Sequence, residues 1–158
     1  MRLWDVNLWV YAFRADSPRH DVVRSALIES LERREPFLFS PSVASSFLRL
    51  VTNPRIFVVP SDFREAWEFI GFLEAHPAAV FAEADAMCFG IFKHLCLVAG
   101  ARGNDVPDAF LAALALRHDA TLVTADAGMK RWQGLAMELI SAADITKDDS
   151  IAKPDNQV

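Results

Sequence analysis

Cysteine and runs of like charge are scarce in this sequence. Its 158 residues include two cysteines, Cys88 and Cys96, which lie in an apolar stretch without a C-x-x-C pair. This spacing fits neither a disulfide framework nor a zinc site, and it favours a reducing compartment. The formal net charge is −5, from 16 Lys and Arg against 21 Asp and Glu, and no basic block occurs. Nonspecific adhesion to nucleic acid through bulk charge is therefore disfavoured.

The patterns of a signal peptide and a membrane span are also missing. Asp5 interrupts the amino-terminal segment where a signal peptide needs an apolar run, and Lys93 and His94 interrupt the most apolar later segment. No glycine-rich phosphate loop and no nucleophile elbow occur. We therefore expect a cytoplasmic protein that does not contact a membrane.

Short apolar runs alternate with segments of helical periodicity, and 53% of the residues are hydrophobic. Because buried strands that alternate with helices are typical of parallel sheets, we expect an α/β fold, with about five short strands and helices on both faces. We predict one domain over residues 1–145 and a polar, flexible tail over 146–158. The expected strands are Leu3–Trp4, Phe37–Phe39, Ala79–Phe81, Thr121–Thr124 and Met137–Ile140.

Three aspartates occur where a parallel sheet binds its ligands. Asp5 follows the first expected strand, Asp126 follows the fourth, and Asp108 lies in the first turn of a very apolar helix. Ligands bind beyond the carboxyl ends of such strands, so the three side chains can face one crevice. Carboxylates brought together repel one another, and a divalent cation removes that cost. Oxygen ligands without a His or Cys cluster favour Mg²⁺ or Mn²⁺.

Each acid also has a structural explanation when it is taken alone. Asp108 can be a favourable charge at a helix amino terminus, Asp105 can cap that helix, and Asp126 can stabilise a turn. Asp5 has less local justification, because it ends an apolar strand. The metal site is therefore predicted from the three acids jointly.

Four segments, which run in order from residue 1 to about 142, carry a combined pattern. They are the opening Leu-Trp-Asp5-Val-Asn7-Leu-Trp-Val-Tyr-Ala, then Phe47-Leu-Arg49-Leu-Val-Thr-Asn53-Pro54-Arg-Ile-Phe57, then Gly103-Asn104-Asp-Val-Pro107-Asp108-Ala-Phe-Leu, and Thr124-Ala-Asp126 with Trp132-Gln-Gly134-Leu. In order and spacing these segments resemble the PIN-domain ribonucleases, and among them the VapC toxins of bacterial toxin–antitoxin pairs.

This resemblance implies a Rossmann-like PIN fold, Mg²⁺-dependent endoribonuclease activity, inhibition by a cognate VapB-type antitoxin, and a homodimer. It assigns the catalytic, metal-binding acids to Asp5, Asp108 and Asp126, with Asn7 and Thr124 as polar support. Hydrolysis of an RNA phosphodiester, in tRNA or another structured RNA, by a metal-bound water is the chemistry expected of such a site.

Two positions depart from the family's pattern. Members commonly carry a glutamate in the helix before Phe-Leu-Arg-Leu, but residues 37–60 contain no acid, and Ala44 is at or next to that position. Gly128 replaces a second acid two residues beyond Asp126. Asp105 can supply a further ligand or only a helix cap. These departures leave open a one-metal enzyme, and also a catalytically weakened relative that binds antitoxin or RNA. A phosphohydrolase for small phosphoesters is a third reading.

Arginines and phenylalanines are the candidates for partner contacts. Arg49 is the best candidate for the RNA backbone, followed by Arg14 and Arg55, although a solvated or helix-pairing role is an alternative for each. Four phenylalanines on two successive helices suggest apolar surface for a dimer or an antitoxin. They are Phe69, Phe72, Phe89 and Phe92.

Overall fold

The computed structural model describes residues 1–82 and 84–140, which form a five-stranded parallel sheet between two helical layers. The strands lie in the order β3-β2-β1-β4-β5, and every neighbouring pair is parallel. All five predicted strands are confirmed. They are β1 (Arg2–Trp4), β2 (Phe37–Phe39), β3 (Ala79–Phe81), β4 (Thr121–Thr124) and β5 (Met137–Leu139). The predicted domain end at residue 145 and the tail over 146–158 lie outside the described residues.

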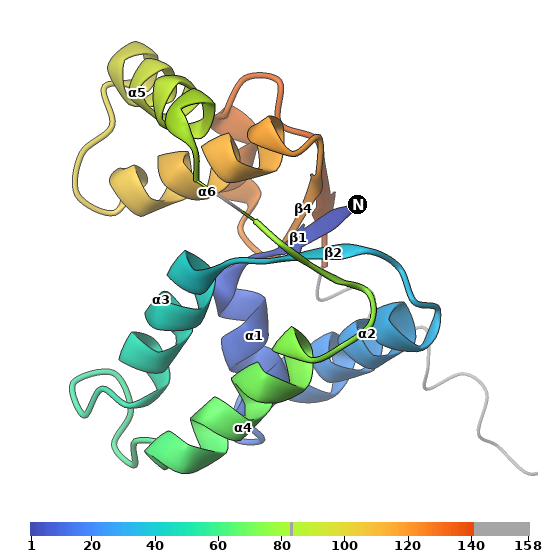
Figure 1. Cartoon of the computed structure of the whole chain (residues 1–158). Coiled ribbons are helices and arrows are strands. Elements are labelled where there is room, and N and C mark those ends of the chain that lie inside the picture. The colour runs from blue at the N-terminus through green and yellow to red at the C-terminus, as the bar shows by residue number, and fades with distance from the viewer. Residues whose placement is uncertain (83, 141–158) are drawn as a thin grey trace, which may run out of the picture.

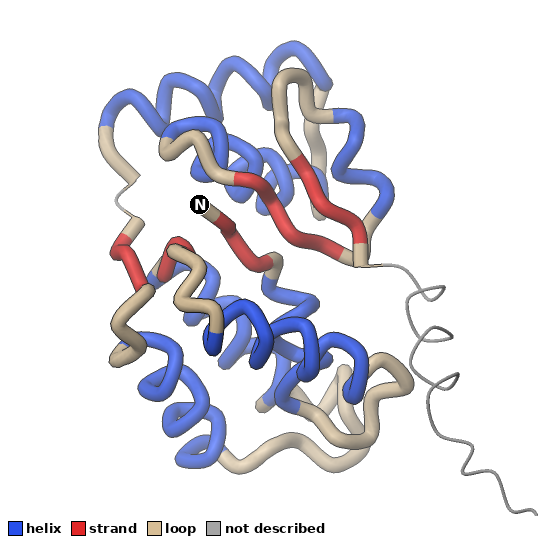
Figure 2. Tube along the Cα trace, turned by 90° about the vertical axis from the view of Figure 1, so that its right-hand side faces the viewer, coloured by secondary structure: helices blue, strands red, loops and turns tan. Residues whose placement is uncertain are grey.

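Helices cover both faces of the sheet, as the alternating pattern predicts (Figure 1). In Figure 2 the strands run between a pair of helices above and a group of helices below. The pair is α5 (Ala86–Ala99) and α6 (Asp105–Arg117), and the group is α1 (Val6–Phe13), α2 (His20–Glu32), α3 (Pro41–Val51) and α4 (Phe63–Glu74). Across the described ranges, no helix combines the length and apolar character that a membrane crossing requires.

The lower layer packs around one aromatic cluster. The ring of Trp9 on α1 lies 5.9 Å from that of Phe39 on β2 and 6.2 Å from that of Phe47 on α3, measured between centroids. Phe69 on α4 completes the cluster at 6.3 Å from Trp9. Aromatic pairs at these separations add about 0.5–1.5 kcal/mol each beyond the area they bury. The cluster therefore holds α1, α3 and α4 against the sheet.

Helix α6 is the most buried helix, as its apolar sequence predicts. Its alanine-rich centre is fully enclosed between the sheet and α5, with Ala109, Ala112 and Ala113 at 0% exposure. Asp85 joins α5 to α6. Its carboxylate caps α5 by accepting from the Cys88 amide (2.9 Å), and it also accepts from the guanidinium of Arg117, at the end of α6, at 2.6–3.1 Å. These contacts hold the upper layer together.

The topology places a switch point between β1 and β4. From β1 the chain proceeds to β2 and β3 on one side, and it returns at β4 to extend the sheet on the other side. The loops that follow β1 and β4 consequently diverge at the carboxyl ends of these two strands, which is where open parallel sheets bind ligands. Asp5 and Asp126 lie in those loops.

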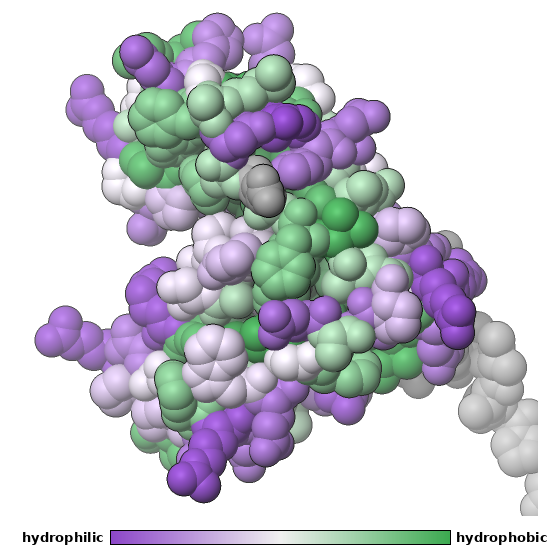
Figure 3. Space-filling view, viewed as in Figure 1, coloured by the Kyte–Doolittle hydropathy of each residue, from purple (hydrophilic) through white to green (hydrophobic). Residues whose placement is uncertain are grey.

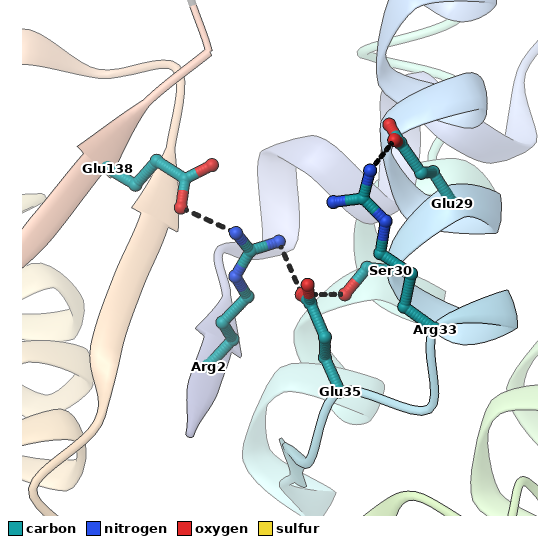
Figure 4. A network of polar contacts seen from close by, with 6 residues as sticks. All are labelled: Arg2, Glu29, Ser30, Arg33, Glu35 and Glu138. Carbon is teal, nitrogen blue, oxygen red and sulfur yellow. Dashed lines mark hydrogen bonds and ion pairs between the residues drawn. The ribbon is translucent and has the colours of Figure 1, made fainter.

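Arg2, at the amino end of β1, joins three segments in a network of opposite charges (Figure 4). Its guanidinium pairs with Glu35, which precedes β2, at 2.9 Å, and with Glu138 on β5 at 3.0 Å. The Ser30 hydroxyl on α2 donates to Glu35 at 3.0 Å. In this network each charge has a partner of opposite sign or a hydrogen-bond donor.

Candidate metal and RNA site

Asp5 is a buried carboxylate at the carboxyl end of β1, with only 5% of its surface exposed. It is also the N-cap of α1, because its Oδ1 accepts from the Asn7 amide at 3.4 Å. Its Oδ2 accepts from the Thr124 hydroxyl at 2.6 Å. Burial raises the pKa of the Asp5 carboxyl, the Thr124 hydrogen bond opposes this, and the nearby charge of Asp126 raises the pKa further.

Thr124 connects the first and fourth strands at this point. Its side chain is fully buried at the end of β4, and its Oγ1 accepts from the Asp126 amide at 3.0 Å while it donates to Asp5. One hydroxyl therefore fixes both the Asp5 side chain and the turn that carries Asp126.

Asp126 is the N-cap of the 3₁₀ helix η1 (Ala127–Arg131) and is exposed. Its Oδ1 accepts from the Gly128 amide at 2.7 Å. A Cβ at residue 128 would lie 3.0 Å from that oxygen, which is closer than ordinary packing allows. Glycine at this position therefore permits the close backbone approach that orients Asp126, and a side chain there would displace the carboxylate.

Asp108 in the first turn of α6 is the third carboxylate of the site. Partial burial raises its pKa, and the negative charges of Asp5 and Asp126 raise it further, while Arg131 opposes them. Three separate segments of the sequence thus place negative charges close enough for the charges of Asp5 and Asp126 to act on Asp108. The ion pairs found over residues 1–82 and 84–140 include none with Asp5, Asp108 or Asp126.

The donor set is that of a hard cation. The three acids supply carboxylate oxygens, and Asp5 is buried with a hydroxyl and an amide as partners instead of a positive charge. Such a set suits Mg²⁺ or Mn²⁺ rather than zinc. Within the described part of the chain, no three His, Cys, Asp or Glu side chains converge as a formed metal centre. The charges of the three acids therefore influence one another, although their carboxylates do not converge on one point in this structure.

A cavity of about 350 Å³ lies beside these acids. Figure 3 shows the surface hollowed between the α5–α6 side and the α3 side of the molecule. Asp5, Asn7 and Asp108 line its polar part, while Phe92 and Phe110 contribute to an apolar part. The remaining lining residues are Val6, Ser42, Val43, Ser46, Val106, Pro107 and Leu111.

Helix α3 presents hydroxyl groups, not carboxylates, to this cavity. Ser42 and Ser46 line it, one helical turn apart, whereas Ala44 is buried in the hydrophobic core at 6% exposure. Ala44, at or next to the position predicted for the missing acid, therefore does not itself face the cavity. The i, i+4 spacing of Ser42 and Ser46 was the available signal, since such residues share one helix face.

The Asp105 carboxylate forms an ion pair with Arg131 and does not cap α6. The N-cap is Asn104, and Asp105 is the first residue of the helix. Its Oδ1 pairs with Arg131 at 2.7 Å, and this contact holds the pKa of Asp105 below its usual range. The Arg131 guanidinium also lies 4.4 Å from the centre of the Trp132 ring. The cap interpretation of Asp105 is thus corrected, because its carboxylate joins the start of α6 to η1.

The candidate arginines have different environments. Arg14 pairs with Asp16, donates to the Ser61 hydroxyl at 2.9 Å and lies over the Phe57 ring at 3.9 Å. These contacts fix the loop after α3, so Arg14 has a structural role. Arg49 is exposed on α3, three residues beyond Ser46, on the helix face that also carries the cavity-lining serines. It lies outside the cavity lining.

Comparison with known proteins identifies the family. The sequence matches the PIN domain over residues 3–135. It is 39% identical over 131 residues to ribonuclease VapC43 of Mycobacterium tuberculosis, covering 83% of this chain and 89% of the relative. Ribonuclease VapC25 of the same species is 36% identical over 132 residues, with 84% and 93% covered. These relatives are ribonucleases, as the four sequence segments predict.

Solved structures confirm the PIN-like fold. VapBC2 from Rickettsia felis, bound to a DNA fragment from its promoter, superposes with a TM-score of 0.64 at 19% identity, covering 87% of this chain and 97% of that one. FitAcB from Neisseria gonorrhoeae superposes at 0.57 and 18% identity, with 87% and 96% covered. From the match over most of its length and the identity to these ribonucleases, the chain belongs to the PIN-domain VapC family of ribonuclease toxins.

Proposed function

We propose that this chain is a Mg²⁺-dependent endoribonuclease that hydrolyses phosphodiester bonds of tRNA or another structured RNA. One observation carries the proposal: Asp5 and Asp108 line one cavity, and burial together with neighbouring negative charge, that of Asp126 included, raises the pKa of both. No ion pair in the described residues offsets the three carboxylates. A carboxylate buried without a counterion costs stability. Its position is explained by a cation that binds there during function, with Mn²⁺ as a substitute for Mg²⁺.

Asp5, Asp108 and Asp126 would hold the metal, directly or through water. When bound, Mg²⁺ lowers the pKa of a water and neutralises charge that develops on phosphoryl oxygens. Thr124 orients the Asp5 carboxylate, and Gly128 orients that of Asp126. The Asn7 side chain at the cavity is a polar group for the water or the phosphate. We assign contact with the RNA backbone outside the cavity to Arg49, which is exposed on the serine face of α3.

A weakened relative that binds RNA or antitoxin without efficient cleavage is the second candidate. It is favoured by one observation, the serines in place of an acid on α3. Fewer carboxylates lower the affinity for a second cation more than for the first. One metal held by three acids is therefore the form of the site that we propose, and activity decides between the two candidates.

The test is cleavage of total tRNA and a structured RNA by the purified chain with Mg²⁺ or Mn²⁺. We expect cuts that EDTA abolishes and that both Asp5→Asn and Asp108→Asn reduce below detection. Nucleotide phosphoesters serve as the parallel substrate. Hydrolysis of these alone would instead support a small-molecule phosphohydrolase. A folded protein that binds Mn²⁺ but leaves every RNA intact would overturn the nuclease and support the binding-only candidate.

We also propose a VapB-type antitoxin and a second copy of this chain as partners. The structural neighbours VapBC2 and FitAcB, which are toxin–antitoxin assemblies, support the antitoxin. Exposed apolar side chains provide surface for partners, since Phe72 on α4 and Phe89 on α5 are 58% and 63% exposed. Phe69 and Phe92, by contrast, are packed against the core. Co-purification with the product of an adjacent small gene, and sedimentation of the chain alone, test the two partners separately. The cytoplasmic location stays a prediction from the sequence.

A further inference from the structure

The apolar wall of the cavity has no role in holding a metal, yet it faces the same space as two of the acids. Phe92 on α5 and Phe110 on α6 meet there edge to face, with centroids 5.6 Å apart and an interplanar angle of 81°. Each ring is partly buried, and each lines the cavity. Two aromatic rings are thus held firmly with part of their surface open to the site.

The charged residues that line this cavity are acidic, and this bears on what its apolar wall could bind. Its described lining contains Asp5 and Asp108 but neither lysine nor arginine. The cation proposed at the carboxylates would attract one phosphate, but the lining adds no positive side chain for the rest of the RNA, and the whole chain carries a net charge of −5. Contacts that do not depend on charge would therefore add to the affinity for an RNA that enters beside the carboxylates.

We propose that Phe92 and Phe110 receive a nucleobase of the RNA, unstacked from its neighbours, next to the phosphate that is cleaved. This inference rests on the proposed ribonuclease function. Single-stranded RNA is recognised by splayed bases that stack on aromatic side chains, and every base has a face for such contact. The volume of about 350 Å³ lies within the range of small-ligand pockets, roughly 300–1,000 Å³.

The serines on α3 complete the pocket on the opposite side. Ser42 and Ser46 line the same cavity as the two rings, and a hydroxyl can donate to or accept from a base edge. The Ser42 hydroxyl lies 2.7 Å from that of Ser40, which limits the directions in which it can bond. Stacking on the rings would supply affinity, and the serines would supply a preference among bases.

The test combines protein variants with modified RNA. A short RNA with one cleavage site is prepared with an abasic nucleotide at each position around the cut in turn. We expect wild-type protein to show an about tenfold higher KM for one abasic position beside the cut, which is the order expected for loss of one base–aromatic stack. Phe110→Leu should raise the KM for the intact RNA by a similar factor. Removing the base at that position should then raise the KM of the variant no further. Such non-additivity would not arise from a merely structural role.

Phe92→Leu provides a second variant in case Phe110→Leu disturbs α6. Phe63→Leu is the matched control, since Phe63 begins α4, is 57% exposed and does not line the cavity. Additive effects of variant and abasic site, or equal cleavage of all abasic RNAs, would overturn the inference while the ribonuclease function stood. Variants that cleave like wild type but escape antitoxin inhibition would assign the rings to the antitoxin instead. Wild-type protein that cleaves no RNA would remove the proposed function and this inference together.

Discussion

The charged side chains at the two ends of β1 lie in opposite environments. Arg2, at the amino end, contacts two carboxylates, and its side chain is partly open to water. Asp5, just past the carboxyl end, is buried, and its partners in the described part of the chain are the Thr124 hydroxyl and backbone amides, with no positive charge among them. Balanced charges at a half-exposed position stabilise a fold modestly, whereas an unbalanced buried charge costs free energy. The comparison supports a structural role for the Arg2 network and agrees with the metal site proposed at Asp5.

The largest expected effect separates activity from stability at the Asp5 end. Asp108→Asn should lower the RNA cleavage rate by about a hundredfold or more, the order found when one group that stabilises transition-state charge is removed. The metal-free variant should remain folded, because the substitution removes a repelling charge. Cleavage assays with Mg²⁺ and thermal unfolding without metal measure both. A cleavage rate equal to that of the wild type would contradict the metal-site assignment.

The next largest effect is stabilisation by the metal itself. At a concentration of about 100 Kd, Mn²⁺ should add about 2.7 kcal/mol to the free energy of unfolding, provided that it binds only the folded chain. Asp5→Asn should remove this gain. Asp105→Asn should keep it, because the Asp105 carboxylate pairs with Arg131. Denaturant unfolding with and without Mn²⁺ provides the measurement, and loss of the gain in Asp105→Asn would make Asp105 a ligand after all.

The pH dependence of stability should have opposite signs at different acids. The folded-state pKa values of Asp5 and Asp108 lie above the usual 3.8, so their destabilising charge disappears as the pH falls through those raised values. Asp85 has the reverse sign. The Arg117 guanidinium holds its pKa at about 2, so its contribution is complete above 3.8 and is lost as the pH falls through about 2.

Metal-free wild type should therefore gain stability relative to Asp5→Asn as the pH falls from 7 toward 4. Urea unfolding of the two proteins at several pH values checks this. Asp85→Asn serves as the opposite control, since its difference from wild type should change only below pH 4. If the stability of wild type and of Asp5→Asn changed with pH in parallel, the pKa of the buried carboxylate would not be raised in the folded protein.

The smallest effect is expected at the Arg2 end. Arg2→Gln should lower the free energy of unfolding by no more than about 1 kcal/mol, because the side chains of its two ion pairs are 30–46% exposed. Cleavage of RNA should be unchanged under conditions where the variant is folded. High salt should reduce the wild type's advantage, since exposed pairs are screened. A loss of cleavage in folded Arg2→Gln would show that the two ends of β1 are coupled.

Some features of the site follow from local sequence and others do not. Asp5 and Asp126 could be predicted because each follows a short apolar strand, and parallel strands end on the same edge of a sheet. Asp108 could be predicted from its place at the start of the most apolar helix. The partner of Asp105 could not, because Arg131 reaches it only when the loop after β4 folds back toward the start of α6. The role of Arg14 was missed for the same reason, since its partner Ser61 lies beyond α3.

The order of strands and helices, the burial of α6 and the three candidate acids can be predicted from the amino-acid sequence alone. These depend on hydrophobic periodicity and on where strands end, which are local properties of the chain. The packed fold is needed to see which α3 residues line the cavity, which acids pair with an arginine, and which aromatic rings line the same cavity as the carboxylates. Those relations depend on how helices rotate and pack across the sheet, and each joins residues that no local pattern connects.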